Sequence, residues 1–184
     1  MNEIICPWYL GYFLASPFRR LMHKPETIVG PYLKKGQTVL DIGSAMGFFT
    51  LPMARIVRNE GKVIAVDLQE KMIRSLRRRA ERAGLSQRIE TRICPATTLG
   101  IDDLANSVDF ALIFAVLHEM PDIRQPLSEV YNALKPQGLL LISEPTGHVT
   151  KEKFGVEISI LKEYGFKIIN TPIIKRNYSI VVQK

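Results

Sequence analysis

Short apolar segments alternate with helical segments along most of this chain, and this alternation leaves few folds open to it. Strands are predicted from apolar runs at residues 38–42, 62–67, 108–114 and 139–143, and from alternating apolar and polar residues at residues 88–94. Helices are predicted between them from apolar residues at helical spacing, at residues 48–57, 69–83 and 123–134. A strand, a helix and a further strand in succession form a parallel pair. We therefore expect an α/β fold with a doubly wound, mostly parallel sheet.

The C-terminal part of the chain extends this sheet. A helix is predicted over residues 151–164 and ends at Gly165. Two further strand patterns follow at residues 166–174 and 178–182, and the short connection between them predicts a hairpin. We therefore expect seven strands, with an antiparallel strand at the C-terminus.

The size of the chain and its aromatic residues predict how it is organised. A chain of 184 residues with 46% hydrophobic content is expected to form a single domain over residues 1–184 with an ordinary buried core. The first 36 residues are rich in aromatic side chains, at Trp8, Tyr9, Tyr12, Phe13 and Phe18. A helical pattern follows at residues 27–33. We therefore expect residues 1–36 to form a short N-terminal helical cap on a core over residues 37–184.

The cellular compartment is predicted from the cysteines and from the N-terminus. Cys6 and Cys94 are too few for a disulfide framework. Glu3 precedes the first apolar stretch, no basic region precedes it, and Pro7 and Pro17 interrupt it, so it does not resemble a signal peptide. No run reaches the roughly 18 uninterrupted apolar residues that cross a bilayer. We expect a cytoplasmic protein.

The net charge of +7 raises the question of a nucleic-acid partner. Much of the excess lies in one arginine-rich stretch, at Arg74, Arg77, Arg78, Arg79, Arg82, Arg88 and Arg92. Glu70 and Glu81 are interspersed, which favours the solvated face of one helix. No aromatic residues alternate with the arginines to stack on bases. A nucleic-acid partner is therefore not expected, although an RNA substrate stays the alternative.

Each of the first two predicted strands has an acid at its end, and two glycines follow the first strand. Asp41 lies at the end of the first strand, Gly43 and Gly47 follow it, and Asp67 ends the second strand. Glycine allows backbone to approach a ligand closely and to adopt positive φ. A carboxylate at a strand end can accept hydrogen bonds from a ligand ammonium group or from both hydroxyls of a ribose. Parallel sheets bind ligands at this edge, so the pattern predicts a nucleoside site.

This succession of strand, acid, glycines, helix, strand and acid resembles the class I S-adenosylmethionine-dependent methyltransferases. Residues 108–119 and 134–145 resemble that family's fourth-strand and fifth-strand segments. The likeness covers about residues 27–184 and is strongest to the small-molecule subset that includes the ubiquinone/menaquinone biosynthesis enzymes. It implies a Rossmann-like seven-stranded fold and S-adenosylmethionine as the cofactor.

The resemblance also implies which residues bind the cofactor. The loop from Gly43 to Gly47 would hold the methionine part, Asp41 would orient its ammonium group, and Asp67 would take the ribose. Leu68 would pack on one side of adenine. The full implied set is Asp41, Gly43, Ser44, Ala45, Gly47, Phe48, Asp67, Leu68, Pro95, Ala96 and Phe114.

Two positions depart from the family pattern. Ala45 replaces the middle glycine of the loop and narrows it, and Cys94-Pro95 stands where many relatives have an acid for the adenine amino group. A nicotinamide dehydrogenase would need glycine at positions 45 and 48, where Ala45 and Phe48 stand. A hydrolase would need a Gly-x-Ser-x-Gly elbow, which the chain lacks. Methyl transfer is therefore favoured over both alternatives.

Candidate groups for the methyl acceptor follow the fourth and fifth strands. His118 and Glu119 come after the fourth, and Glu144 and His148 follow the fifth. A protic acceptor needs a general base, and histidine titrates near neutral pH. His118, Glu119 and Glu144 are therefore the candidate catalytic residues, although His118 could instead only close its loop. A metal is not expected, because these residues are distant in sequence and lack ligand spacing.

The acceptor is predicted to be a small, apolar or aromatic molecule. The chain has Phe-Ala-Val-Leu at residues 114–117, where enzymes that methylate planar amino groups have an Asp/Asn-Pro-Pro-aromatic segment. The N-terminal aromatic residues could cover such an acceptor or contact a membrane surface. Two alternatives stay open, an RNA-directed methyltransferase and a non-catalytic protein that binds S-adenosylmethionine. The oligomeric state is not indicated.

Overall fold

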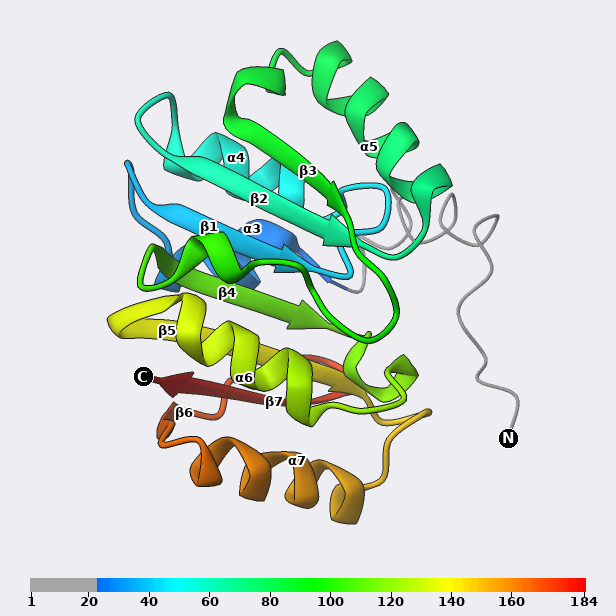
Figure 1. Cartoon of the computed structure of the whole chain (residues 1–184), viewed down its shortest axis with the longest axis vertical. Coiled ribbons are helices and arrows are strands. Elements are labelled where there is room, and N and C mark those ends of the chain that lie inside the picture. Colours follow the sequence, from blue (N-terminus) through cyan, green and yellow to red (C-terminus); the bar gives the residue numbers. More distant parts are fainter. Residues whose placement is uncertain (1–22) are drawn as a thin grey trace.

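The structure is a computed structural model that describes residues 23–184. Within these residues, seven strands form one mixed sheet in the order β3-β2-β1-β4-β5-β7-β6 (Figure 1). The strands are β1 (Thr38–Ile42), β2 (Lys62–Asp67), β3 (Ile89–Ile93), β4 (Val108–Phe114), β5 (Leu134–Pro145), β6 (Lys167–Asn170) and β7 (Asn177–Gln183). The pairs from β3 to β5 are parallel, and β7 is antiparallel to β5 and β6. The predicted Rossmann-like fold and its C-terminal hairpin are confirmed.

Helices cover both faces of the sheet. One face packs against α3 (Pro25–Val29), α4 (Thr50–Val57) and α5 (Glu70–Arg82), and the other against α6 (Arg124–Ala133) and α7 (Lys151–Glu163). Figure 1 shows α6 in front of the sheet and α3 behind it. Short 3₁₀ turns complete the connections, at Gly30–Tyr32, Ser86–Arg88, Asp102–Leu104 and Leu117–Glu119.

Side chains of β1 alternate between the two faces, because successive residues of a strand point in opposite directions. Val39 packs in the apolar cluster of α3, α4 and α5, whereas Leu40 and Ile42 pack in the cluster of α6 and α7. Since both faces are covered, the central strands read as continuous apolar runs. Asp41 has the same parity as Val39, so its carboxylate lies on the α4 side of the sheet.

β5 is longer than its apolar run. The sequence predicts a strand at residues 139–143, and the structure extends it from Leu134 to Pro145. Leu134 pairs with Val108, and the register shifts before the parallel ladder continues. The Lys-Pro-Gln-Gly segment lies in this irregular part, where Gln137 has a φ of +67°. Residues 135–138 have the composition of a turn, but in the structure they form an irregular, bulged part of β5.

The predicted N-terminal cap lies only partly within the described residues. α3 and the turn Gly30–Tyr32 stand where the sequence predicts a helix at residues 27–33, and the ring of Tyr32 stacks on Phe110 with centroids 6.1 Å apart. The aromatic residues between positions 8 and 18 lie outside the described residues. Their part in a lid or in membrane contact stays a prediction. Among the helices of residues 23–184, none has the length and apolar character needed to cross a membrane.

The strand order reverses between β1 and β4. The chain leaves β1 toward β2 and β3 on one side, then crosses back to add β4 and β5 on the other side. The loops after β1 and β4 therefore depart in opposite directions, and sheets of this kind bind ligands between such loops at the carboxyl ends of the strands. The predicted site residues after β1, β2, β4 and β5 all lie at this edge (Figure 1).

Replacing Phe110 by alanine tests the core on the α4 side. The ring is fully buried, so Phe110→Ala is expected to lower the free energy of unfolding by about 3–5 kcal/mol. Ile173→Ala is the control, because Ile173 is fully exposed and its truncation is expected to change stability by less than about 0.5 kcal/mol. Chemical denaturation measures both. Equal effects of the two substitutions would contradict this packing.

Candidate active site

Asp41 and Asp67 lie on the same face of the sheet. Asp41 pairs with Ala65 in the parallel ladder, and Asp67 comes two residues after Ala65, so both carboxylates have the same parity. Asp41 is buried, and the hydroxyl of Thr50 at the start of α4 donates to its Oδ2 at 2.5 Å. The two acids therefore occupy adjacent strand ends beneath α4 and α5, as the sequence predicts.

The turn after β1 is held close to the end of β2. The backbone N–H groups of Gly43 and Ser44 donate to the carbonyl of Val66, at 2.9 and 3.1 Å. The N–H of Gly47 then donates to the carbonyl of Ser44 at 2.9 Å, which closes a tight turn. Gly43 has a φ of +69°, and a Cβ there would lie 2.6 Å from a methyl group of Val116. Glycine is therefore required at position 43 by conformation and by space.

The carboxylate of Asp67 joins this turn to β2. Its Oδ2 accepts from the N–H of Ala45 and its Oδ1 accepts from the N–H of Gln69, both at 2.8 Å. Burial raises the pKa of Asp67, and the two backbone hydrogen bonds oppose that rise. A carboxylate oxygen can accept more than one hydrogen bond, so Asp67 can still accept from the hydroxyls of a ribose.

One buried side chain in the turn has an unmet hydrogen-bonding capacity. The hydroxyl of Ser44 has no partner among the described residues, although the residue is only 5% exposed. A buried polar atom normally has a partner, and a hydroxyl can both donate and accept. Ser44 therefore fits a polar ligand group beside Asp41, such as the amino-acid end of S-adenosylmethionine.

Apolar residues lie at the end of β3 and just after β2 and β3. Leu68 is 36% exposed and Ile93 is 50% exposed, which is high for large apolar side chains. Pro95 and Ala96 are exposed beyond them. Burial, and then the charge of Asp67, raises the pKa of Cys94 to about 11, so its thiol stays neutral at physiological pH. This surface suits a flat, uncharged ring such as adenine.

The two aromatic residues predicted to contact the cofactor lie mainly in the core. Phe114 at the end of β4 packs against Phe49 with ring centroids 4.5 Å apart and against His23 at 5.3 Å. Phe48 packs perpendicular to Phe49 at 5.2 Å. Phe48 and Phe114 are both buried in the apolar cluster that α3, α4 and α5 form with the sheet. Contact of either ring with the cofactor stays a prediction.

On the acceptor side, Glu144 organises the loop after β4. Its carboxylate is fully buried and accepts from the backbone N–H groups of Val116, Leu117 and His118, at 3.1, 3.0 and 3.3 Å. It also pairs with Nδ1 of His118. Both oxygens of Glu144 are thus engaged, which suits a residue that positions His118.

The pair with Glu144 sets the properties of His118. Burial lowers the pKa of His118, but the hydrogen bond and charge of Glu144, with the charges of Glu119 and Glu157, outweigh burial and raise it. With Nδ1 directed at Glu144, Nε2 is the nitrogen left for another partner. The side chain of His118 is 18% exposed, so part of it can be reached from outside the protein.

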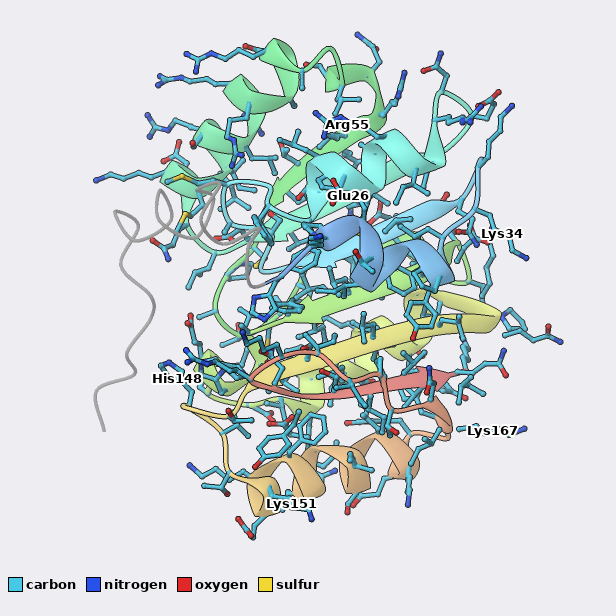
Figure 2. The ribbon with its side chains drawn as sticks, turned by 180° about the vertical axis from the view of Figure 1, so that it is seen from behind. Glu26, Lys34, Arg55, His148, Lys151 and Lys167 are labelled. Carbon is cyan, nitrogen blue, oxygen red and sulfur yellow. The ribbon has the colours of Figure 1, made fainter. Side chains whose placement is uncertain are left out.

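Other titratable groups surround this pair. The ring of His148 lies 5.1 Å from that of His118, and Figure 2 shows His148 in the loop after β5, at the end of the sheet opposite Lys34 and Lys167. Glu119, on the same 3₁₀ turn as His118, is half-buried. In the chain from His23 onward, no group of three or more histidine, cysteine or acidic residues is arranged to hold a metal ion.

Sequence reasoning did not find Glu157. This residue of α7 is 7% exposed, its Oε2 has no partner among the described residues, and burial followed by the charge of Glu144 raises its pKa to about 7. His118 opposes that rise. In the sequence, Glu157 is one acid in an amphipathic helix. Its burial depends on how α7 packs, so no local signal indicates it.

The arginine-rich stretch contacts the protein itself at several points. Arg77 donates to Thr91, and Arg88 donates to the carbonyl of Ala54. Arg92 belongs to β3, and it pairs with Glu90 and Asp103. Arg79 was also missed as a site residue. Its Nη1 donates at 2.5 Å to the carbonyl of Met46, in the turn from Gly43 to Gly47 (the glycine turn). Arg79 stands three residues after Leu76 and directly before Ala80, and both of these are apolar. This spacing is the sequence signal that could have distinguished Arg79 from the exposed arginines.

The fold is that of a Rossmann-like domain, and its carboxyl edge carries the candidate nucleoside site. A family model described as a methyltransferase domain matches residues 33–177. The chain belongs to this family and is an S-adenosylmethionine-dependent methyltransferase domain. The predicted family and cofactor are confirmed.

The similar proteins include enzymes described as ubiquinone/menaquinone biosynthesis C-methyltransferases. A ubiquinone/menaquinone biosynthesis C-methyltransferase of Rickettsia felis is 31% identical over 136 residues, which are 72% of this chain and 52% of that protein. The Escherichia coli protein of the same description is 32% identical over 112 residues, covering 61% and 44%. The chain thus spans about half the length of the curated relatives it matches. A methyltransferase structure from Aquifex aeolicus has a TM-score of 0.86 and 25% identity, over 97% of this chain and 99% of that one.

Replacing Glu157 by glutamine tests the buried charge cluster. The folded pKa of about 7 lies above the ordinary value of 4.5, so ionisation of Glu157 costs stability as the pH rises between these values. The substitution is expected to stabilise the protein by at most about 3 kcal/mol above pH 7, with the gain fading as the pH falls toward 4.5. Thermal or chemical unfolding from pH 5 to pH 8 measures it. A gain that is independent of pH would contradict this assignment.

Proposed function

We propose that this domain transfers a methyl group from S-adenosylmethionine to a small, apolar or aromatic acceptor, with His118 as the general base. The observation that carries the proposal is the pairing of His118 with the buried carboxylate of Glu144. His118 lies in the loop after β4, and this loop is next to the glycine turn, because Val116 of the same loop lies against Gly43. A base is thus held beside the cofactor residues.

The cofactor residues have separate tasks in this proposal. Asp41 and the hydroxyl of Ser44 bind the amino-acid end, and Asp67 accepts from the ribose hydroxyls. Leu68, with Pro95 and its neighbours, packs against adenine. S-adenosylmethionine supplies a methyl group already activated by its positively charged sulfur. The protein therefore has to align the acceptor, exclude water and remove a proton.

His118 removes that proton at Nε2. The acceptor loses a proton to His118 as it forms a bond to the methyl carbon, and the methyl–sulfur bond breaks to leave a neutral thioether. The imidazolium that results is stabilised by Glu144 at Nδ1, whose buried carboxylate also fixes the orientation of the ring. Glu144 is a positioning residue in this scheme.

The surroundings of His118 support an apolar acceptor. Val116 and Met120 flank it in sequence and are partly buried against the core, so they offer apolar surface near the base. The relatives described as ubiquinone/menaquinone biosynthesis C-methyltransferases also support a phenolic or quinol-like ring. A hydroxyl on such a ring has a proton that a histidine base can remove.

Titration calorimetry with S-adenosylmethionine tests the cofactor part. The wild-type protein is expected to bind, and Asp67→Asn is expected to raise Kd about 10-fold or more, because a charged acceptor for the ribose is lost. Asp103→Asn is the control, since Asp103 is exposed and lies on a surface turn. Absence of binding by the wild-type protein would contradict the proposed function itself.

Turnover with small phenols and quinols tests the base. His118→Gln is expected to lower kcat about 100-fold or more while Kd for S-adenosylmethionine changes little. The wild-type rate should rise with pH through a pKa above 6.5, because His118 must be neutral and its pKa is raised. Glu144→Gln should move that rise to lower pH, since it removes the carboxylate that raises the pKa. An unchanged pH profile in both variants would reject His118 as the base.

A further inference from the structure

The glycine turn is fixed by hydrogen bonds on both sides of Ala45 and Met46. The N–H of Ala45 donates to Asp67 at 2.8 Å, and the N–H of Gly47 donates to the carbonyl of Ser44 at 2.9 Å. The carbonyl of Met46 belongs to the same peptide group as the N–H of Gly47. Its acceptor capacity is used by the guanidinium of Arg79, at 2.5 Å. The peptide group between Met46 and Gly47 is therefore held at both its ends.

The turn needs such support because of the residue at position 45. Ala45 has a φ of +46°, in the left-handed region that side chains with a Cβ disfavour. Turns with positive φ at their second residue normally place glycine or asparagine there. With alanine, the turn lacks this intrinsic preference, so its shape depends more strongly on the bonds that surround it.

α5 supplies the support. Arg79 comes one helical turn after Leu76, and the side chain of Leu76 lies directly against Gly47, where a Cβ would collide with it. Leu76 and Arg79 therefore approach the turn from the same face of the helix, one by apolar packing and the other by a charge-assisted hydrogen bond. The neighbouring Arg78 is exposed.

We propose that Arg79 is a positioning residue that holds the glycine turn, strained at Ala45, in the shape that binds the amino-acid end of S-adenosylmethionine. The inference rests on the proposed function for its ligand. The hydrogen bond from Arg79 to Met46 that holds the turn is a property of the protein alone. Without Arg79 the peptide group between Met46 and Gly47 can rotate, and Ala45 can relax to negative φ. Ser44 and the turn backbone would then no longer face the ligand together.

Two measurements on the full chain test this proposal, with Arg78→Met as the matched control from the same helix. In the ligand-free protein, Arg79→Met is expected to speed amide hydrogen exchange at Gly47 several-fold, because the turn opens locally more often. In calorimetry, Arg79→Met is expected to raise Kd for S-adenosylmethionine about 10-fold, and Arg79→Lys is expected to recover part of that loss. The control should match the wild-type protein in both.

The double variant Ala45→Gly with Arg79→Met distinguishes loss of the support that Arg79 gives the turn from general destabilisation. Ala45→Gly removes the strain, so the increase in Kd caused by Arg79→Met is expected to be smaller with glycine at position 45 than with alanine. Exchange at Gly47 and a Kd that both stay within twofold of the control would overturn the proposal, as would an equal effect of Arg79→Met in both backgrounds. If the wild-type protein does not bind S-adenosylmethionine, the proposed function fails. The exchange data still decide whether Arg79 holds the glycine turn.

Discussion

The hydrogen bond from the N–H of Ala45 to the carboxylate of Asp67 joins the turn after β1 to the end of β2. The proposed cofactor site is built on these two segments. This hydrogen bond brings the turn after β1 against the end of β2 and gives a buried carboxylate one of the backbone donors it requires. Without Asp67, the N–H of Ala45 would lose its partner on β2, although the hydrogen bonds of Gly43 and Ser44 to Val66 would still join the turn to that strand. The same residue is the one proposed to bind the ribose, so turn geometry and nucleoside binding share one side chain.

Glu144 has a corresponding place on the other side of the point between β1 and β4 where the strand order reverses. It ends β5 and accepts backbone N–H groups from the loop after β4, as Asp67 ends β2 and accepts one from the loop after β1. In both cases a carboxylate on one strand fixes the loop that follows the neighbouring parallel strand. This arrangement places the loops after β1 and β4 next to each other, where Val116 lies against Gly43. Methyl donor and general base would meet at that contact.

Much of the fold could be predicted because it depends on local patterns. Continuous apolar runs follow from strands covered on both faces, and the parity of Asp41 and Asp67 places them together once the strands are parallel. The bulge in β5 could not be predicted, since Lys-Pro-Gln-Gly is typical of a turn and only the pairing with β4 makes it part of a strand. The N-terminal cap beyond α3 stays a prediction, as do the single domain and the cytoplasmic location.

The candidate site was predictable in position and less so in detail. Glycine and acid spacing identified the turn, but the sequence does not reveal that Glu144 uses its oxygens on three backbone N–H groups. That outcome depends on the path of a neighbouring loop. Arg79 and Glu157 were missed for a similar reason, because contacts with Met46 and with the Glu144 pair arise only when α5 and α7 pack on the sheet.

A crystal structure of the protein with bound S-adenosylhomocysteine tests the central claim most directly. The account predicts the product at the carboxyl edge, with both ribose hydroxyls within hydrogen-bond distance of Asp67, the amino group beside Asp41, and the sulfur facing the loop that holds His118. A nucleoside bound at another edge of the sheet, or a ribose with no contact to Asp67, would contradict it.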